Sequence, residues 1–94
     1  MPMTIKLDHH HRSTVEALYR HPIGHNIQWR DVISLLGRFG EVRESHRGGW
    51  TCTIDADTHS FGRARGRDLS EDQVVKIRHF LQAMGVTEDG EVAA

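Results

Sequence analysis

The sequence predicts a small α+β domain in which helices pack against a three-stranded antiparallel sheet. The chain has 94 residues, close to the lower limit for a core without metals or disulfides, so it holds one domain. Apolar residues recur at helical spacing in three segments, and between the second and third they alternate as in β-strands. The predicted order is therefore α-α-β-β-β-α, with a domain at 13–86 between an N-terminal tail (1–12) and a C-terminal tail (87–94).

The first predicted helix runs from about Ser13 to Arg20. Ser13 and Glu16 have the spacing of a capping box, in which a hydroxyl and a carboxylate satisfy backbone N–H groups at a helix start. Pro22 ends this helix, because the residue before a proline is disfavoured in helical geometry.

The second predicted helix, from about Trp29 to Phe39, has the clearest periodicity. Its apolar positions at i, i+3, i+4 and i+7 are Trp29, Val32, Ile33 and Leu36. This pattern predicts that one face of the helix is buried in the core.

Three short strands are expected next. The first, near 41–45, has Val42 as its one strongly apolar residue, which is typical of an edge strand. The second alternates apolar and polar residues, and its inward set is Trp50, Cys52 and Ile54. The third includes Phe61 and runs toward Arg65, and Gly62 is a candidate β-bulge.

The last predicted helix has the most explicit start. Ser70 and Gln73 form a second capping box, and Leu69 and Val74 occupy the positions of a hydrophobic staple. Gly85 is expected to end the helix in the left-handed conformation.

Composition restricts the classes of function. The formal net charge of −1 argues against a protein that holds nucleic acid by bulk electrostatics, although ten of the twelve basic residues are arginines, which suit bidentate contact with phosphate or carboxylate. No apolar run could span a membrane, no secretory signal is evident, and Cys52 is the single cysteine. A cytoplasmic protein without disulfides or cofactors is expected.

Two segments resemble the helices of the HicA family: Trp29-Arg-Asp-Val-Ile-Ser-Leu-Leu-Gly37 and Val75-Lys-Ile-Arg-His-Phe-Leu81. The order of elements is similar, and the segment 11–22 with Asn26-Ile-Gln-Trp29 resembles a subgroup with an extra leading helix. The similarity covers roughly residues 11–86. It implies a double-stranded-RNA-binding-domain-like fold, the activity of an mRNA interferase toxin (an endoribonuclease), and a HicB-like antitoxin as partner.

The chain departs from that family at the catalytic position. There a catalytic histidine follows a Gly-Ser pair just before the second strand, whereas Gly48 and Gly49 occupy this place here. The proline- and histidine-containing segment after the third strand is replaced by Gly62-Arg-Ala-Arg-Gly-Arg67. The catalytic residue therefore cannot be transferred from the family by alignment.

Candidates for the catalytic residues must therefore come from the side chains that this sequence contains. RNA cleavage through 2′-OH attack needs a base, an acid and positive charge near the phosphorus. His46, next to Arg47 in a glycine-rich turn, is the candidate base, and His59 on the third strand is a candidate acid or phosphate contact. The alternatives are a solvated loop residue for His46 and a half-buried structural histidine for His59.

Alternate arginines follow the third strand. Arg63, Arg65 and Arg67 would lie on one side of an extended segment, where they could contact successive phosphates or simply protect a sheet edge from pairing. The predicted RNA-binding set is Arg47, Gly48, Gly49, Arg63, Arg65 and Arg67.

The remaining histidines do not predict a metal site. Neither the run His9-His10-His11 nor the pair His21 and His25 has a spacing typical of zinc ligands. Two classes of function remain open: a HicA-like RNA-binding protein, which is an interferase if a catalytic group is retained, and a non-catalytic protein-interaction module with the same fold.

Overall fold

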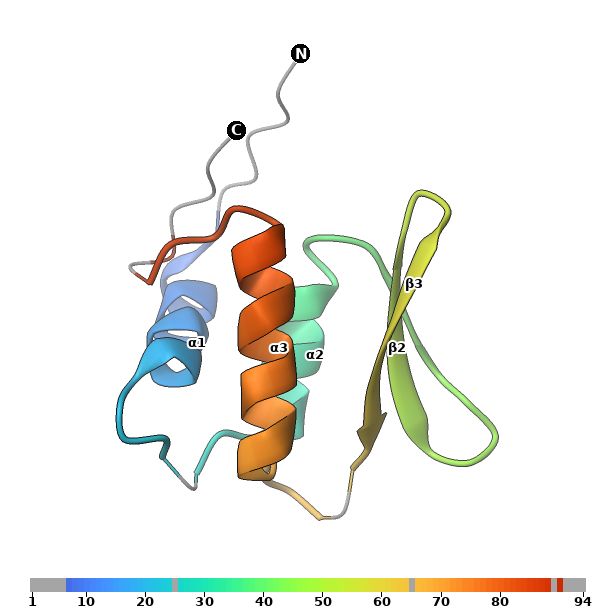
Figure 1. Ribbon diagram of the computed structural model, residues 1–94, viewed down its shortest axis with the longest axis horizontal. Coiled ribbons are helices and arrows are strands. Elements are labelled where there is room, and N and C mark those ends of the chain that lie inside the picture. The colour runs from blue at the N-terminus through green and yellow to red at the C-terminus, as the bar shows by residue number, and fades with distance from the viewer. Residues whose placement is uncertain (1–6, 25, 65, 89, 91–94) are drawn as a thin grey trace.

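The computed structural model describes residues 7–24, 26–64, 66–88 and 90, and it confirms the predicted order of elements. The helices are α1 (His9–Tyr19), α2 (Trp29–Leu36) and α3 (Glu71–Ala83), and the strands are β1 (Glu41–Glu44), β2 (Gly49–Ile54) and β3 (Asp57–Arg63). The strands form one antiparallel sheet in the order β1-β2-β3. Figure 1 shows the three helices on one face of this sheet, with α2 and α3 next to the strands and α1 packed against those two helices. None of the described helices is both long and apolar enough to pass through a bilayer.

The core lies between the helices and the sheet. Its most completely buried side chains come from all three helices and from β2, and they are Leu18, Leu35, Leu36, Ile77, Leu81, Val15, Val32, Val74 and Cys52. Phe80 of α3 adds edge-to-face contacts with Phe39 and Phe61, at ring-centroid distances of 6.2 Å and 5.3 Å. Aromatic pairs of this geometry stabilise a core beyond their buried area.

The start of α1 differs from the prediction. The helix begins at His9, four residues before Ser13, because Asp8 is the N-cap and its carboxylate accepts a hydrogen bond from the backbone N–H of His11 at 2.8 Å. Aspartate caps a helix as well as serine does. Ser13 lies inside the helix, where its hydroxyl donates to the carbonyl oxygen of His9. Residues 9–12 are therefore helical rather than part of a tail.

The second helix is shorter than predicted. It ends at Leu36, and a tight turn follows in which the N–H of Phe39 donates to the carbonyl oxygen of Leu36 at 2.9 Å. Phe39 is still buried, so the turn continues the apolar pattern that predicted a longer helix. Leu35 is fully buried, whereas Ile33, which the predicted stripe placed in the core, is half-buried.

The predicted bulge in β3 is confirmed. Ser60 pairs with Thr51 and Gly62 pairs with Trp50, so Phe61 is the extra residue, and Gly62 has a positive φ of 85°. Phe61 and Gly62 both face the helices. Because the extra residue shifts the alternation, Arg63 faces the opposite side of the sheet. The strand ends there, two residues before Arg65.

The predicted features of α3 are confirmed. The side chains of Ser70 and Gln73 make both hydrogen bonds of the capping box, and Leu69 and Val74 are buried. Gly85 has a positive φ of 79° just after the C-cap. Gln73 also donates to the carbonyl oxygen of Arg63 at 2.7 Å, which attaches the end of β3 to the start of α3.

Candidate nucleic-acid interface

The turn between β1 and β2 presents a histidine and an arginine to solvent. The N–H of Gly48 donates to the carbonyl oxygen of Ser45 at 2.9 Å, and the N–H of Gly49 donates to the Ser45 hydroxyl at 3.1 Å. Gly48 has a φ of +80°, a conformation that favours glycine. His46 and Arg47 at the tip are exposed, and no hydrogen bond or ion pair joins their side chains to another described residue. Both side chains are therefore free to meet a ligand.

Arg63 lies beside this turn. Its backbone pairs with Gly49, and its Nε is 3.9 Å from the point where a Cβ on Gly48 would stand. The side chain is exposed. The structure therefore brings together an arginine from the end of β3 and the glycine turn that carries His46 and Arg47.

Arg67 occupies a different place. Gly66 turns the chain with a φ of +109°, and the carbonyl oxygen of Arg67 accepts a hydrogen bond from the N–H of Trp29 at 2.9 Å. Its guanidinium lies 3.4 Å from the carboxylate of Asp68. Arg63 is thus at the β1–β2 turn and Arg67 is beside the start of α2, while Arg65 lies outside the described residues.

A hollow of about 580 Å³ lies next to Arg63 at the start of α3. Arg63 and Gln73 line it, but so do the carboxylates of Asp68 and Asp72. Since phosphate avoids carboxylates, the hollow is a poor anion site. The basic surface is accordingly the turn side of Arg63.

His59 does not share the site of His46. It pairs with Cys52, whereas Arg63 pairs with Gly49, three residues or about 10 Å away along β2. His59 also lies on the side of the sheet that faces the helices. Its ring is half-buried and makes an edge-to-face contact with Phe80, with the ring centroids 4.9 Å apart. The two histidines that the sequence offered as base and acid therefore stand at separate places.

His59 instead lines a second depression, the α3–β3 groove, together with Phe61, Lys76, His79 and Phe80. Sequence reasoning gave Lys76 and His79 no functional role. Their spacing relative to Phe80, at i, i+3 and i+4 on α3, was the signal that could have placed them on one helix face.

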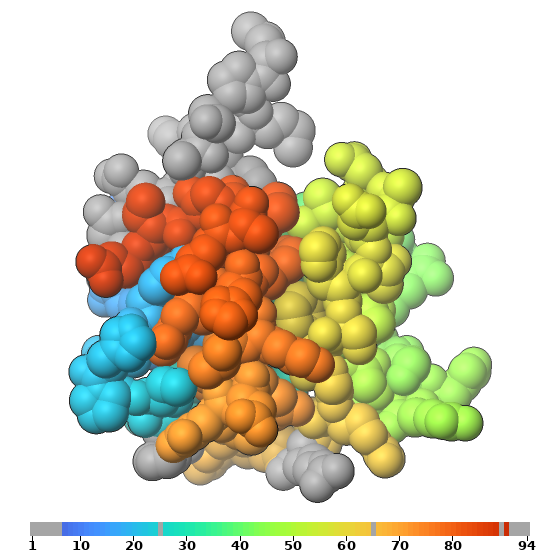
Figure 2. All heavy atoms as spheres, viewed as in Figure 1, coloured from blue at the N-terminus to red at the C-terminus, as the bar shows by residue number. Residues whose placement is uncertain are grey.

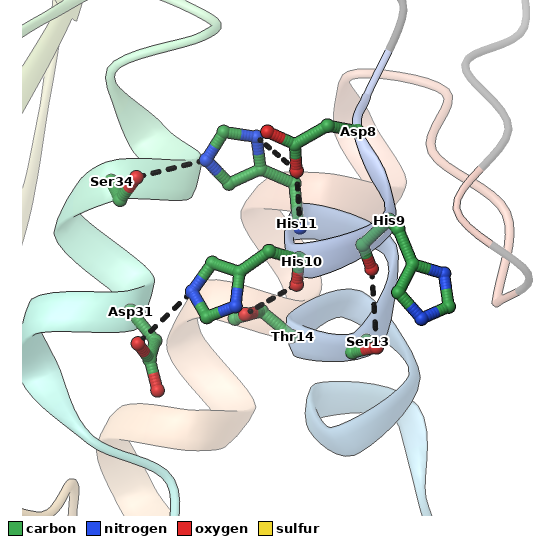
Figure 3. Close-up of polar contacts among 8 residues, drawn as sticks. All are labelled: Asp8, His9, His10, His11, Ser13, Thr14, Asp31 and Ser34. Atoms are coloured by element: carbon green, nitrogen blue, oxygen red, sulfur yellow. Dashed lines mark hydrogen bonds and ion pairs between the residues drawn. The ribbon is translucent and has the colours of Figure 1, made fainter.

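The N-terminal histidines connect two helices. Figure 3 shows the ring of His10 next to Asp31, with Nε2 and Oδ1 3.2 Å apart, and the ring of His11 between Asp8 and Ser34. Nε2 of the buried His11 is 2.8 Å from the Ser34 hydroxyl, and Nδ1 is 3.3 Å from Oδ1 of Asp8. The contacts of His10 with Asp31 and of His11 with Ser34 join α1 to α2.

The electrostatics of Asp8 follow from its capping role. The backbone N–H of His11 lowers the pKa of the Asp8 carboxyl below its ordinary value, and the charges of His11, His10 and Arg38 act in the same direction. Among the described residues no group of three histidine, cysteine or carboxylate side chains gathers as a metal site, and His25 of the second histidine pair lies outside them.

Comparison with known proteins gives no assignment. No protein-family model, curated protein or solved structure matches this chain. A functional proposal must therefore be built on the residues and the geometry of the chain itself.

Proposed function

We propose that this chain is a HicA-like RNA-binding protein that holds RNA at the β1–β2 turn, with a HicB-like antitoxin as its partner. The observation that supports this proposal is the placement of the Arg63 guanidinium against Gly48, in the turn that also carries His46 and Arg47. The side chains of His46, Arg47 and Arg63, from two separate segments, thus lie on one exposed surface.

The chemistry of this surface suits a phosphate backbone. A guanidinium donates two parallel hydrogen bonds to a phosphate, and glycines leave room for the sugar–phosphate chain to approach closely. Because the net charge of the chain is −1, binding must depend on these few local contacts rather than on a general positive field. Moderate affinity with a shallow salt dependence is expected.

The experiment measures affinity for a labelled single-stranded RNA by fluorescence anisotropy at several salt concentrations. Each phosphate contact contributes about 0.7 to the slope of log affinity against log salt concentration. Replacing Arg47 and Arg63 by glutamine should weaken binding and reduce that slope by about 1.4. Replacing Arg63, Arg65 and Arg67 by alanine should also weaken binding.

The matched control is Arg30→Gln, which removes an exposed arginine from α2 without touching the turn. Its affinity and slope should equal those of the wild type. Unchanged affinity in the Arg47 and Arg63 double variant would remove this surface from the proposal. If the wild type does not bind RNA at all, the non-catalytic interaction module is the remaining interpretation of the fold.

A further inference from the structure

Ser34, His11 and Asp8 form a chain of side-chain contacts between α1 and α2 (Figure 3). Nε2 of His11 lies 2.8 Å from Oγ of Ser34, and Nδ1 of the same ring lies 3.3 Å from Oδ1 of Asp8. A hydroxyl, an imidazole and a carboxylate in this order are the groups that activate a serine as a nucleophile, and they are recognised by their geometry rather than by their positions in the sequence. These three side chains, called the Ser34 site below, therefore have the order of contacts that acyl transfer to a serine requires.

The contacts of His11 determine which ring nitrogen carries the proton. Nδ1 is buried, and among the described residues the carboxylate of Asp8 is the one group within reach that can accept its proton. This contact is longer than an ordinary hydrogen bond, as catalytic hydrogen bonds often are before a substrate binds. Because the pKa of the Asp8 carboxyl is lowered by the backbone N–H of His11, Asp8 is ionised at neutral pH. A proton on Nδ1 leaves the lone pair of Nε2 to accept from the Ser34 hydroxyl, which is the tautomer that can remove a proton from Ser34.

The serine of the site is open to solvent, whereas its imidazole is not. Ser34 is exposed on α2, and His11 is only 7% exposed. Ser13 on α1 is also exposed, but its hydroxyl donates to the carbonyl oxygen of His9, and no hydrogen bond joins it to an imidazole of a described residue. Ser34 thus differs from an ordinary surface serine, because a base lies within hydrogen-bond distance of an oxygen that a substrate can reach.

The charges and the space around the site restrict its substrate. Asp8 places one carboxylate beside the His11 ring. Asp31, three residues before Ser34, places a second on the same surface of α2, and two carboxylates disfavour a phosphate or another anion. Asp31 also lines a hollow of about 200 Å³ between α1 and α2, which is smaller than the pockets of drug-sized ligands. A small, neutral acyl group fits these conditions.

We propose that the Ser34 site transfers small acyl groups from neutral carboxylic esters, with Ser34 as the nucleophile, His11 as the general base and Asp8 as the residue that positions the imidazole. Oγ attacks the carbonyl carbon of the ester while its proton moves to Nε2 of His11. The bond from that carbon to the alcohol oxygen breaks, the alcohol takes the proton from Nε2, and the acyl group remains on Oγ. Water then attacks the acyl carbon and gives a proton to His11, the carboxylic acid leaves, and Oγ takes the proton back.

Turnover at this site should be slow. Ser34 lies inside α2, where the hydrogen bonding of the helix occupies its backbone N–H, so this N–H cannot stabilise the negative oxygen of the intermediate. One such donor typically changes a rate about 100-fold or more. Acylation of Ser34 by an activated ester is therefore the step to measure.

The Ser34 site is separate from the basic surface at the β1–β2 turn. It lies on α1 and α2, and α2 is almost hidden behind α3 in the view of Figure 2. The proposal therefore does not depend on RNA binding.

The experiment treats the full chain with p-nitrophenyl acetate at neutral pH, follows the release of p-nitrophenolate and locates the acetyl group by peptide mass spectrometry. The wild type should release a burst of about one equivalent, followed by slow turnover, and carry the acetyl group on Ser34. Free imidazoles also hydrolyse this ester, so the position of the stable acetyl group decides the outcome. Ser34→Ala should abolish the burst. Ser13→Ala, the matched control, should keep it.

Variants of His11 and Asp8 test the roles of the base and of the positioning residue. His11→Gln should lower the rate of Ser34 acetylation about 100-fold. Asp8→Ser keeps a helix cap but removes the carboxylate, and it should lower the rate about 10-fold. Nitrogen NMR of the His11 ring should find the proton on Nδ1 in the wild type and partly on Nε2 in Asp8→Ser, whereas a residue that only capped α1 would not change the tautomer. Circular dichroism checks the fold of both variants.

The proposal is overturned if no acetyl group appears on Ser34, if Ser34 and Ser13 are acetylated equally, or if Ser34 is acetylated as fast in urea-unfolded wild type as in the folded protein. The contact between Ser34 and His11 would then serve only to join the two helices. The comparison in urea needs no variant, so it decides the question even if His11→Gln does not fold. None of these results bears on the proposed RNA binding.

Discussion

The buried guanidinium of Arg78 in α3 donates from Nε to the carbonyl oxygen of Leu18 in α1, at 2.8 Å and across 60 residues of sequence. Its Nη2 also donates to the carbonyl oxygen of Arg20, at 3.3 Å. Carbonyl groups in the last turn of a helix have no partner within the helix, and they form its negative end. Arg78 thus caps the C-terminus of α1 from a neighbouring helix.

Replacing Arg78 by methionine should lower the free energy of unfolding by about 3 kcal/mol, because two hydrogen bonds from a charged donor are lost and the carbonyl oxygen of the buried Leu18 remains unpaired. Arg78→Lys should not restore stability, since an ammonium group lacks the planar geometry that reaches both carbonyls. Urea unfolding measures both values. Arg30→Met on the exposed side of α2 is the control, and equal stability of the Arg78→Met variant and the wild type would contradict the capping role.

Asp8 should make the stability of the fold depend on pH. Its pKa in the folded chain is below the ordinary value of 3.8, so its contribution is complete above that value and is lost as the pH falls through the folded pKa. Asp8→Asn keeps a capping side chain but does not titrate. Urea unfolding at pH 6, 4 and 2.5 should therefore show an advantage of the wild type over Asp8→Asn that disappears at the lowest pH. A difference that is constant with pH would count against this assignment.

Cys52 should be unreactive in the folded protein. Burial raises the pKa of its thiol, which also donates toward the carbonyl oxygen of Leu36 at 3.7 Å, so little thiolate forms at neutral pH. A disulfide reagent should modify Cys52 slowly in buffer and rapidly in denaturant. An exposed thiol made by Ala56→Cys in a Cys52→Ala background should react at once in both conditions. Fast reaction of native Cys52 would show that β2 opens readily.

Two glycines near the end of α2 should respond differently to alanine. A Cβ on Gly40 would stand 2.7 Å from Cγ1 of Ile54 and even closer to the backbone oxygen of Thr53, so Gly40→Ala should cost about 2 kcal/mol. Gly37 has helical dihedral angles and meets backbone oxygens only at 3.5 Å. Gly37→Ala should therefore leave stability unchanged or raise it by about 0.5 kcal/mol. Thermal unfolding of the pair compares them directly.

The sequence predicted those parts of the fold whose signals are local. The capping box of α3 and the left-handed Gly85 involve neighbouring residues, and both were confirmed. The start of α1 was not predictable in this way, because Asp8 and Ser13 are both competent caps. In the structure the ring of His11, in the first turn of the helix, contacts Ser34 on another helix, and local spacing in the sequence does not reveal such a long-range contact.

In the candidate site, too, local features could be predicted from the sequence and contacts between distant elements could not. Antiparallel pairing follows from adjacent strands and a short turn, and in the structure this pairing brings Arg63 opposite Gly49. The position of Lys76 and His79 beside His59 could not be predicted from the sequence. A helix with a buried stripe has two flanks, and only the packing of α3 against β3 decides that this flank meets His59.

Because of the bulge at Phe61, the number of residues in β3 decides which face of the sheet Arg63 occupies. The extra residue places Arg63 on the face of the sheet away from the helices. Deleting one residue there would restore the regular alternation of side chains between the two faces, and the guanidinium would then lie on the same side as α3. A single-codon indel in this strand would thereby transfer positive charge from one face of the molecule to the other, with every arginine still present in the sequence.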